Sequence, residues 1–205
     1  MRMRTHERRK GILRAAGDMF RELGFSRASM AAISEKAGGS KATLYSYFKS
    51  KEELFAAVMF DAMNEQGQQV LGLLDPSDPD LRAVLERFGA AYLGMLLGVE
   101  ALANTRVAIA EAENSKLGPR LYHLGPRPFW DAVAAYIDTQ MSRGALAAAP
   151  PPLAALHLQG LLEAGVVEPA LFGVEPLVER RRGVEAAVDL FLCRYGAAPP
   201  GLERW

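Results

Sequence analysis

Two short helical patterns lie on either side of a turn of only three residues, Gly38-Gly39-Ser40. Ser29 is of a residue type that caps helices, and it opens the first pattern, which ends at Ala37 before the glycine pair. Ser40 caps the second pattern, which runs to about Phe48. A turn this short sets two short helices across each other, so the sequence predicts a helix-turn-helix unit.

Helical periodicity continues on both sides of this unit. Apolar residues recur at helical spacing from Ile12 to Leu23, and Gly24 follows at the place of a left-handed C-terminal cap. The capping box Ser50 to Glu53 opens a long helix that is expected to run to about Leu74. The prolines and short polar residues at 75–79 cannot continue it. Further helical patterns cover residues 81–97, 100–114, 127–143, 153–171 and 177–195.

No alternating pattern is long enough for a strand to compete with these helices. The sequence therefore predicts an all-α fold of about nine helices. The division between an N-terminal and a C-terminal domain is expected after the helix-turn-helix unit, with the domains at residues 1–50 and 51–205.

Charge is distributed unevenly along the chain, although the formal net charge is zero. Residues 1–51 hold 12 of the 24 Lys and Arg residues but only 4 of the 24 acidic residues, a net charge of +8, so the remainder carries −8. A basic segment of this kind is typical of a surface for a polyanion, and the acidic remainder then has another task. The alternative is a basic helix that only faces solvent.

The second helix of the predicted unit has two different faces. At about 100° per residue, Leu44 and Phe48 point the same way and are expected to pack inward. The opposite face, which includes Ser46, is small and polar, and this suits the major groove of duplex DNA. Contacts with bases or phosphates are expected from this face and from the N-terminal end of the helix, at Ser40, Lys41, Ala42, Thr43 and Tyr45.

Four residues beside this helix are candidates for holding the DNA backbone. Lys49 and Lys51 supply positive charge near its C-terminal end. Arg27 and Ser29, at the start of the preceding helix, combine a charge with exposed backbone amides. An isolated tyrosine or threonine on such a surface is more often an ordinary solvent-facing side chain, so the prediction depends on the whole set.

Together these residues resemble the DNA-binding domain of the TetR/AcrR family of regulators. The likeness runs from Arg8 to about Val58 and is most specific in Thr43-Leu44-Tyr45, followed by Tyr47-Phe48-Lys49 and Lys51. It implies a transcriptional regulator with an N-terminal three-helix DNA-binding domain. It also implies a homodimer whose two heads read a palindromic operator in successive major grooves of double-stranded DNA.

The resemblance also assigns individual positions. Tyr45, Tyr47 and Lys49 match positions at which the family contacts phosphate, and Ser40 to Thr43 match its base-proximal positions. The helical wheel places Tyr47 near the packed face, so Tyr47 ranks below Tyr45 as a contact. Gly39 departs from the family, which usually carries an apolar residue there.

The C-terminal half resembles the subgroup of these regulators that often controls efflux pumps. The likeness lies in Phe129-Trp130, Arg143 to Leu146 and Leu158 to Leu162. It implies a helical domain that binds a ligand and dimerises, with the helices at 153–171 and 177–195 packed on those of the partner. Their apolar residues exceed what one buried stripe needs. These residues are Leu156, Leu161, Leu162, Val184, Val188, Leu190 and Phe191.

A ligand pocket is expected among the helices of this half, mostly apolar with a few polar groups. Aromatic side chains provide flat walls, and Arg106 is a lone cation within an apolar helical run. The alternative for each candidate is ordinary core packing, which is commoner for an aromatic residue or a methionine at helical spacing. The candidates are Phe88, Tyr92, Met95, Arg106, Tyr122, Phe129, Trp130 and His157.

The sequence shows no residue set for catalysis, and neither a metal nor another cofactor is expected. His6, His123 and His157 are scattered, and no Gly-rich phosphate loop accompanies them. Cys193 is the only cysteine, which fits a reducing compartment. No stretch approaches the roughly 20 apolar residues of a membrane span, so the chain is expected in the cytoplasm, away from membranes.

These observations favour one function and leave two alternatives open. The favoured function is a ligand-responsive repressor that binds a palindromic operator as a homodimer and is released by a small, largely apolar molecule. The first alternative is a constitutive DNA-binding protein whose C-terminal half is only a dimerisation scaffold. A helical enzyme ranks third. The operator, the inducer and the regulated genes are not predicted.

Overall fold

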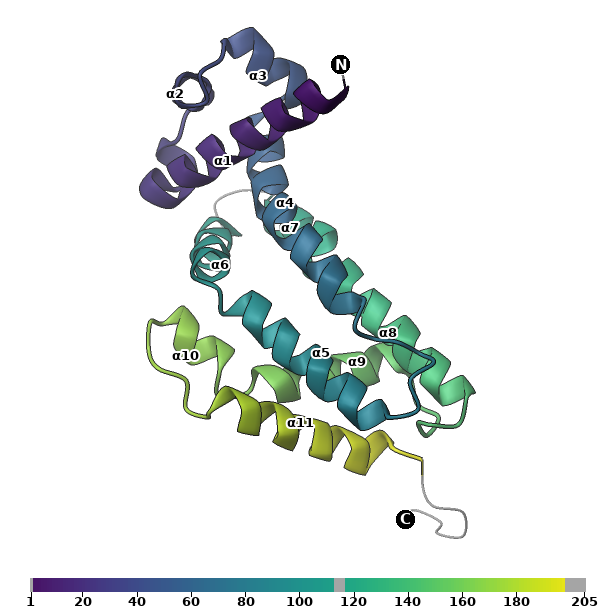
Figure 1. Ribbon diagram of the computed structural model, residues 1–205. Helices are drawn as coiled ribbons and strands as arrows, with labels where there is room; N and C mark the ends of the chain where they lie inside the picture. Colours follow the sequence, from purple (N-terminus) through teal and green to yellow (C-terminus); the bar gives the residue numbers. More distant parts are fainter. Residues whose placement is uncertain (1, 113–116, 198–205) are drawn as a thin grey trace. The chain divides into compact units, whose positions relative to one another are not determined.

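The computed structural model describes residues 2–112 and 117–197, and there the fold is all-α, as predicted (Figure 1). The side chains of residues 2–5, 60–64, 117, 120 and 124 lie outside this description. The described residues form eleven helices and no strand, with one isolated bridge between Leu146 and Gly196. The helices are α1 (Arg2–Arg27), α2 (Met30–Lys36), α3 (Lys41–Tyr47), α4 (Lys51–Leu71), α5 (Leu81–Leu96), α6 (Val99–Ala112), α7 (Leu117–Leu124), α8 (Pro126–Ser142), α9 (Pro151–Glu163), α10 (Val167–Leu171) and α11 (Arg180–Tyr195).

Two short helices account for the difference from the expected number. The pattern at 153–171 is interrupted because Gly165 adopts a φ of 69°, so α9 ends before it and α10 begins after it. α7 contains Pro119 in its first turn, where a missing N–H costs no helical hydrogen bond. Residues 113 and 114, the end of the pattern expected at 100–114, lie outside the described residues.

The first helix starts earlier than its apolar pattern and is interrupted where that pattern ends. α1 begins at Arg2, ten residues before Ile12. Gly24, with φ 76° and ψ 168°, has non-helical geometry inside it, so the helix breaks at the predicted position, although this ψ is not that of the expected left-handed cap. One further turn follows, in which the amide of Ala28 donates to the carbonyl of Gly24 at 3.3 Å.

The chain forms two compact units. The first contains Met1–Glu65 and Val99–Gly125, and the second contains Gln66–Gly98 and Pro126–Trp205. α6 and α7 therefore belong with the N-terminal helices although they follow α5 in the sequence. The expected functional division between residues 50 and 51 stays a prediction, because compactness alone does not separate two functions.

The core of the first unit is built around three aromatic side chains. Phe20, Phe25 and Phe55 are buried, and their ring centres lie between 4.9 and 6.0 Å apart. Leu44 of α3 and Ile33 of α2 belong to the same buried cluster. The helix-turn-helix is thereby anchored on α1 and on the first turns of α4.

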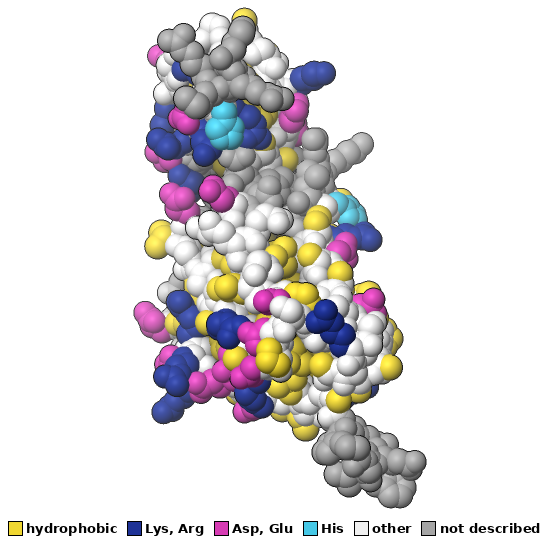
Figure 2. All heavy atoms as spheres, turned by 45° about the vertical axis from the view of Figure 1, so that its right-hand side comes forward, with side chains coloured by type: hydrophobic (Ala, Val, Ile, Leu, Met, Phe, Trp, Pro, Cys, Tyr) yellow, Lys and Arg dark blue, Asp and Glu magenta, His cyan; other side chains and the backbone are white. Residues whose placement is uncertain are grey.

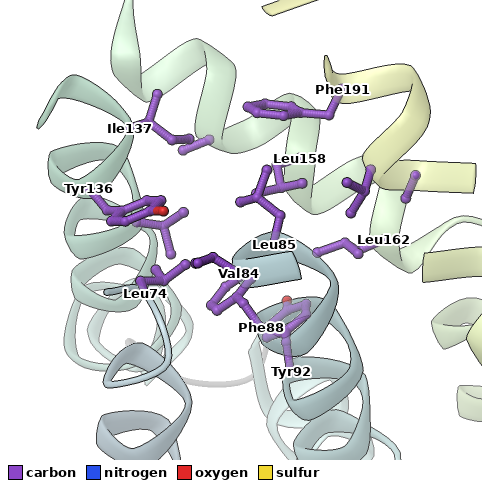
Figure 3. Packing of buried hydrophobic residues seen from close by; sticks show 14 of the residues in the cluster. Leu74, Val84, Leu85, Phe88, Tyr92, Tyr136, Ile137, Leu158, Leu162 and Phe191 are labelled. Atoms are coloured by element: carbon purple, nitrogen blue, oxygen red, sulfur yellow. The ribbon is translucent and has the colours of Figure 1, made fainter. Parts of the chain in front are cut away.

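The core of the second unit lies among α5, α8, α9 and α11. Phe88 of α5, Ile137 of α8, Leu158 of α9 and Phe191 of α11 are fully buried and point toward the same interior (Figure 3). Burying four such side chains contributes about 1.5–3 kcal/mol each to folding. This core holds α9 and α11 side by side.

The surface of the described residues mixes charged and apolar side chains. Figure 2 shows Lys and Arg side chains (dark blue) spread over the face in view and mixed with Asp and Glu side chains (magenta). Apolar side chains (yellow) lie between the charged ones over much of the same face. Within the described part of the chain, no single helix is long and apolar enough to cross a membrane, and only the bent pair α5 and α6 reaches that length and composition together.

Candidate DNA-binding surface

α3 begins at a serine cap and packs one side into the first unit. Ser40 has extended backbone geometry, and its Oγ accepts a hydrogen bond from the amide of Thr43 at 3.1 Å. Leu44 is 2% exposed and Phe48 is 3% exposed. The prediction that these two residues anchor the helix inward is therefore confirmed.

The other side of α3 faces solvent. Ser40, Lys41, Ala42 and Ser46 are exposed, and Tyr45 is 48% exposed. This side carries hydroxyl groups, a methyl group and an ammonium group. Such a mixture can contact base edges, thymine methyl groups and phosphates.

Two residues of this side are partly covered. Thr43 is half-buried, and its Oγ1 lies 2.9 Å from Ser40 Oγ, so the two hydroxyls orient each other. Tyr47 is half-buried, and its ring packs against the core of the first unit. This burial agrees with the helical wheel, which ranked Tyr47 below Tyr45 as a DNA contact.

The start of α2 presents a capped helix end. Ser29 is the N-cap, and its Oγ accepts a hydrogen bond from the amide of Ala32 at 3.2 Å. Arg27 is exposed, and its Nε donates to the carbonyl of Leu23 at 2.9 Å. The guanidinium is thus directed back along the end of α1 in this conformation.

The turn between α2 and α3 is closed by side chains from two helices. Gly38 has a φ of 63°, a conformation that favours glycine. Arg8 of α1 donates from Nη2 to the carbonyl of Gly38 at 2.9 Å, and Ser34 of α2 donates from Oγ to the carbonyl of Gly39 at 2.8 Å. Arg8 and Ser34 were not identified from the sequence, because neither belongs to a capping pattern and Arg8 lies 30 residues before Gly38.

The two lysines after α3 have different surroundings. Lys49 is exposed, and its backbone amide donates to the Glu53 carboxylate at 2.8 Å. The amide of Glu53 donates to Ser50 Oγ at 3.1 Å, which confirms the serine half of the predicted capping box, while the Glu53 carboxylate accepts from the residue before the cap. Lys51, in contrast, directs its ammonium group to the backbone carbonyls of Phe25 and its neighbours.

Five of the eight predicted ligand-binding residues lie together in the second unit. Phe88, Tyr92, Phe129 and Trp130 form a cluster of rings whose centres are 5.2–6.3 Å apart. Met95 is buried on the same helix as Phe88 and Tyr92. Figure 3 shows Phe88 and Tyr92 on neighbouring turns of α5. The rings pack closely on one another, so this cluster is part of the core as well as a candidate site.

A polar group accompanies the ring cluster. Tyr92 donates from its hydroxyl to the Glu163 carboxylate at 2.5 Å, and Gln159 donates from Nε2 to the same oxygen at 2.9 Å. Burial and the nearby Glu163 carboxylate raise the pKa of Tyr92 well above its usual range, so its hydroxyl keeps its proton. Glu163 and Gln159 were missed because nothing in the sequence connects α9 to α5.

The other three candidates lie elsewhere. Arg106 of α6 and Tyr122 of α7 are exposed residues of the first unit. His157 is exposed on α9, and its Nδ1 lies 2.6 Å from the hydroxyl of Tyr195 on α11. Within the described residues, no group of three or more possible metal ligands occurs, which includes the surroundings of His123.

The buried and exposed sides of α3, its short turn and its helical neighbours define a helix-turn-helix DNA-binding protein. Two family models agree with this class. Residues 12–58 match the model described as bacterial regulatory proteins, tetR family, and residues 83–197 match the AefR-like transcriptional repressor, C-terminal domain. The chain belongs to the TetR family of transcriptional regulators.

Solved structures and curated relatives agree with this assignment. A protein from Mesorhizobium loti MAFF303099, described as a TetR-family transcriptional regulator, superposes with a TM-score of 0.83 at 27% identity, covering 95% of this chain and 99% of that one. The flavonoid-responsive regulator FrrA superposes with a TM-score of 0.81 at 29% identity, covering 96% and 100%. The activator FasR of Mycolicibacterium smegmatis (strain ATCC 700084 / mc(2)155) is 37% identical over 90 residues, 42% of this chain. The match spans only 41% of FasR, about two fifths of its length.

Proposed function

We propose that this chain binds duplex DNA through the outward side of α3 and the start of α2. The observation that carries the proposal is the division of α3 between a buried Leu44 and a small, hydroxylated side open to solvent. A helix side of this size and polarity fits the major groove. The proposed DNA contacts are Arg27, Ser29, Ser40, Lys41, Ala42, Thr43, Tyr45, Tyr47 and Lys49.

The proposed contacts have two kinds of role. Residues 40–43, at the N-terminal end of α3, lie where a recognition helix meets base edges. Ala42 contacts a thymine methyl group, and Lys41 contacts guanine or phosphate. Tyr45 and Lys49 are exposed and hold phosphates, which adds affinity without reading sequence.

A homodimer places two such heads on a palindromic operator. α9 and α11 keep apolar side chains exposed, with Leu153 at 47%, Leu156 at 52% and Leu190 at 59% exposure, while Leu158 and Phe191 of the same helices pack in the core. Exposed apolar groups on two adjacent helices favour an interface with a second copy. The two-fold symmetry of the dimer then requires two half-sites about 34 Å apart on the DNA.

The second unit binds a small, largely apolar molecule, and the ring cluster at Tyr92 is the proposed site. Its rings offer flat apolar walls, and the Tyr92 and Glu163 pair offers one polar anchor. A relative of 29% identity, FrrA, is named as flavonoid-responsive, and a flavonoid is a planar aromatic molecule with hydroxyl groups. A ligand of this kind would enter by displacing ring-to-ring contacts.

Ligand binding releases the DNA by a shift between two conformations. α4 runs from the first unit into the second. A conformation of the second unit that binds the ligand more tightly therefore changes the position of the two DNA-binding domains of the dimer. A difference of about 1–3 kcal/mol in relative affinity is enough for induction. Repression is proposed because the C-terminal domain matches a repressor-type family, although FasR is named an activator.

Selection of bound sequences from a random pool of duplex DNA tests the DNA-binding proposal. The expected result is a palindrome whose half-sites are separated by about one helical turn. A chain that retains no duplex even at low salt would exclude the proposal. A single, non-repeated site would contradict the homodimer.

Ligand response is tested on the selected duplex. Planar aromatic compounds are first screened for a rise in unfolding temperature, and each compound that binds is then titrated into the protein–DNA complex. The expected result is a fall in DNA affinity. Unchanged affinity with every bound compound would favour the constitutive DNA-binding alternative.

A further inference from the structure

The last turn of α1 and the residue that follows it bring three backbone carbonyls to one point. Gly24 breaks α1, and the carbonyl oxygens of Phe25, Ser26 and Ala28 lie 2.8, 3.3 and 3.1 Å from the Nζ atom of Lys51. Carbonyls at a helix end have no partner within the helix and need donors from elsewhere. Lys51 provides these donors from the first residue of α4.

The ammonium group of Lys51 is fully engaged by these partners. An ammonium has three N–H donors, and three carbonyl oxygens match them here. The same nitrogen lies 4.3 Å from the centre of the Phe25 ring, and the Phe25 side chain is buried. A DNA phosphate would have to displace these interactions before it could bind Lys51.

The backbone position of Lys51 is also held in place. Ser50 Oγ accepts the amide of Glu53 at 3.1 Å, and the Glu53 carboxylate accepts the amide of Lys49 at 2.8 Å. These two hydrogen bonds hold the first turn of α4. The side chain of Lys51 therefore starts from a defined position and reaches 23–26 residues back along the sequence.

We propose that Lys51 is a positioning residue that ties the α1–α2 connection to the first turn of α4 and so sets Ser29 and the start of α2. This role replaces the direct contact with the DNA backbone that the sequence predicts for Lys51. The inference rests on the proposed function, because the start of α2 belongs to the proposed DNA-binding surface. It also gives α4 a direct link, through one side chain, to a second element of that surface.

Salt dependence separates the two roles. Each lysine that neutralises a phosphate contributes about 0.9 to the slope of log affinity against log salt concentration. A positioning residue contributes to affinity without contributing to that slope. Lys49 is a matched control, because it lies two residues away, is exposed and is a proposed phosphate contact.

The experiment compares Lys51→Met and Lys49→Met with the unmodified protein. Affinity for a mixed-sequence DNA duplex is measured over a range of salt concentrations, and amide hydrogen exchange is measured on the free protein. Lys51→Met is expected to weaken binding with an unchanged slope and to speed exchange of the Ala28 and Ala32 amides by about tenfold. Lys49→Met is expected to reduce the slope by about 0.9 and to leave this exchange unchanged.

A reduced slope for Lys51→Met with unchanged exchange would overturn the proposal. If Lys51→Met does not fold, Lys51→Arg gives the decision, because the planar guanidinium keeps the charge but does not match three converging carbonyls. If the Ala28 and Ala32 amides exchange faster in Lys51→Arg than in the unmodified protein, the positioning role of Lys51 is supported. If they exchange at the same rate, that role is contradicted. Because exchange is measured without DNA, a failure of the protein to bind duplex contradicts the proposed function separately.

Discussion

Arg8 and Gly39 form a complementary pair at the turn of the helix-turn-helix. The guanidinium of Arg8 donates from Nη2 to the carbonyl of Gly38, and it fills the space that a side chain at Gly39 would occupy. The ideal Cβ position of residue 39 overlaps Arg8 Nη2. The absence of a side chain at Gly39, where the family usually carries an apolar residue, thus leaves room for a residue of α1 to close the turn.

A double-mutant cycle tests this pair. Gly39→Ala is expected to displace the guanidinium of Arg8. Gly39→Ala and Arg8→Ala should therefore each remove the hydrogen bond to Gly38, and each should lower the unfolding free energy by about 0.5–1.5 kcal/mol. Because both changes remove the same interaction, the double mutant should cost little more than either single change. Chemical denaturation measures the three values.

Gly11→Ala is the control for the glycine change. An added Cβ at Gly11 in α1 meets nothing within 4 Å. This substitution should therefore stabilise the helix by about 0.5–1 kcal/mol. Fully additive effects of Gly39→Ala and Arg8→Ala would show that the two residues are not coupled.

The two sides of α3 should separate stability from DNA binding. Leu44→Ala is expected to cost about 2–5 kcal/mol of unfolding free energy, since Leu44 is fully buried. Tyr45→Ala is expected to change the unfolding free energy by less than about 0.5 kcal/mol and to weaken binding of the selected duplex. Thr43→Ala should also weaken binding, with a smaller stability change than Leu44→Ala. Denaturation and duplex titration of all three variants give the comparison, and parallel losses in both measurements would refute the assignment of sides.

Two glycines of α5 should respond in opposite directions to the same substitution. An added Cβ at Gly89 would lie 2.7 Å from Leu162 Cδ2 and 3.1 Å from Val184 Cγ1, both on buried side chains. Gly89→Ala is therefore expected to destabilise the second unit by about 1–3 kcal/mol. Gly94→Ala, where nothing lies within 4 Å, should stabilise the same helix by about 0.5–1 kcal/mol. Denaturant titration distinguishes the two, and a stabilising Gly89→Ala would mean that α5 does not pack so closely.

Tyr92 should make stability depend on alkaline pH. Burial and the Glu163 carboxylate raise the pKa of Tyr92, so the folded protein keeps a proton that the unfolded chain loses above about pH 10. The unfolding free energy should therefore fall as pH rises through that range, by about 1.4 kcal/mol per pH unit from this residue. Tyr92→Phe should remove that part of the slope. Denaturation from pH 9 upward measures it, and identical slopes in both proteins would rule out a buried, protonated hydroxyl.

Local chemistry was sufficient to predict most helices and the orientation of α3. The caps at Ser29, Ser40 and Ser50 each join groups three residues apart, and all three are present. The inward side of α3 follows from a period of about 3.6 residues, so Leu44 and Phe48 could be assigned to the core from spacing alone. The aromatic residues of α5 and α8 were recognised as candidates from their residue type, because aromatic side chains provide flat walls.

Tertiary packing decided which distant groups meet. Arg8 reaches Gly38 across 30 residues, Lys51 reaches Phe25 across 26, and Tyr92 reaches Glu163 across 71. Packing also separated Arg106 and Tyr122 from the ring cluster, because α6 and α7 belong to the first unit. Periodicity and capping act within about one turn of a helix, whereas these pairings depend on how whole helices bury their apolar sides against one another.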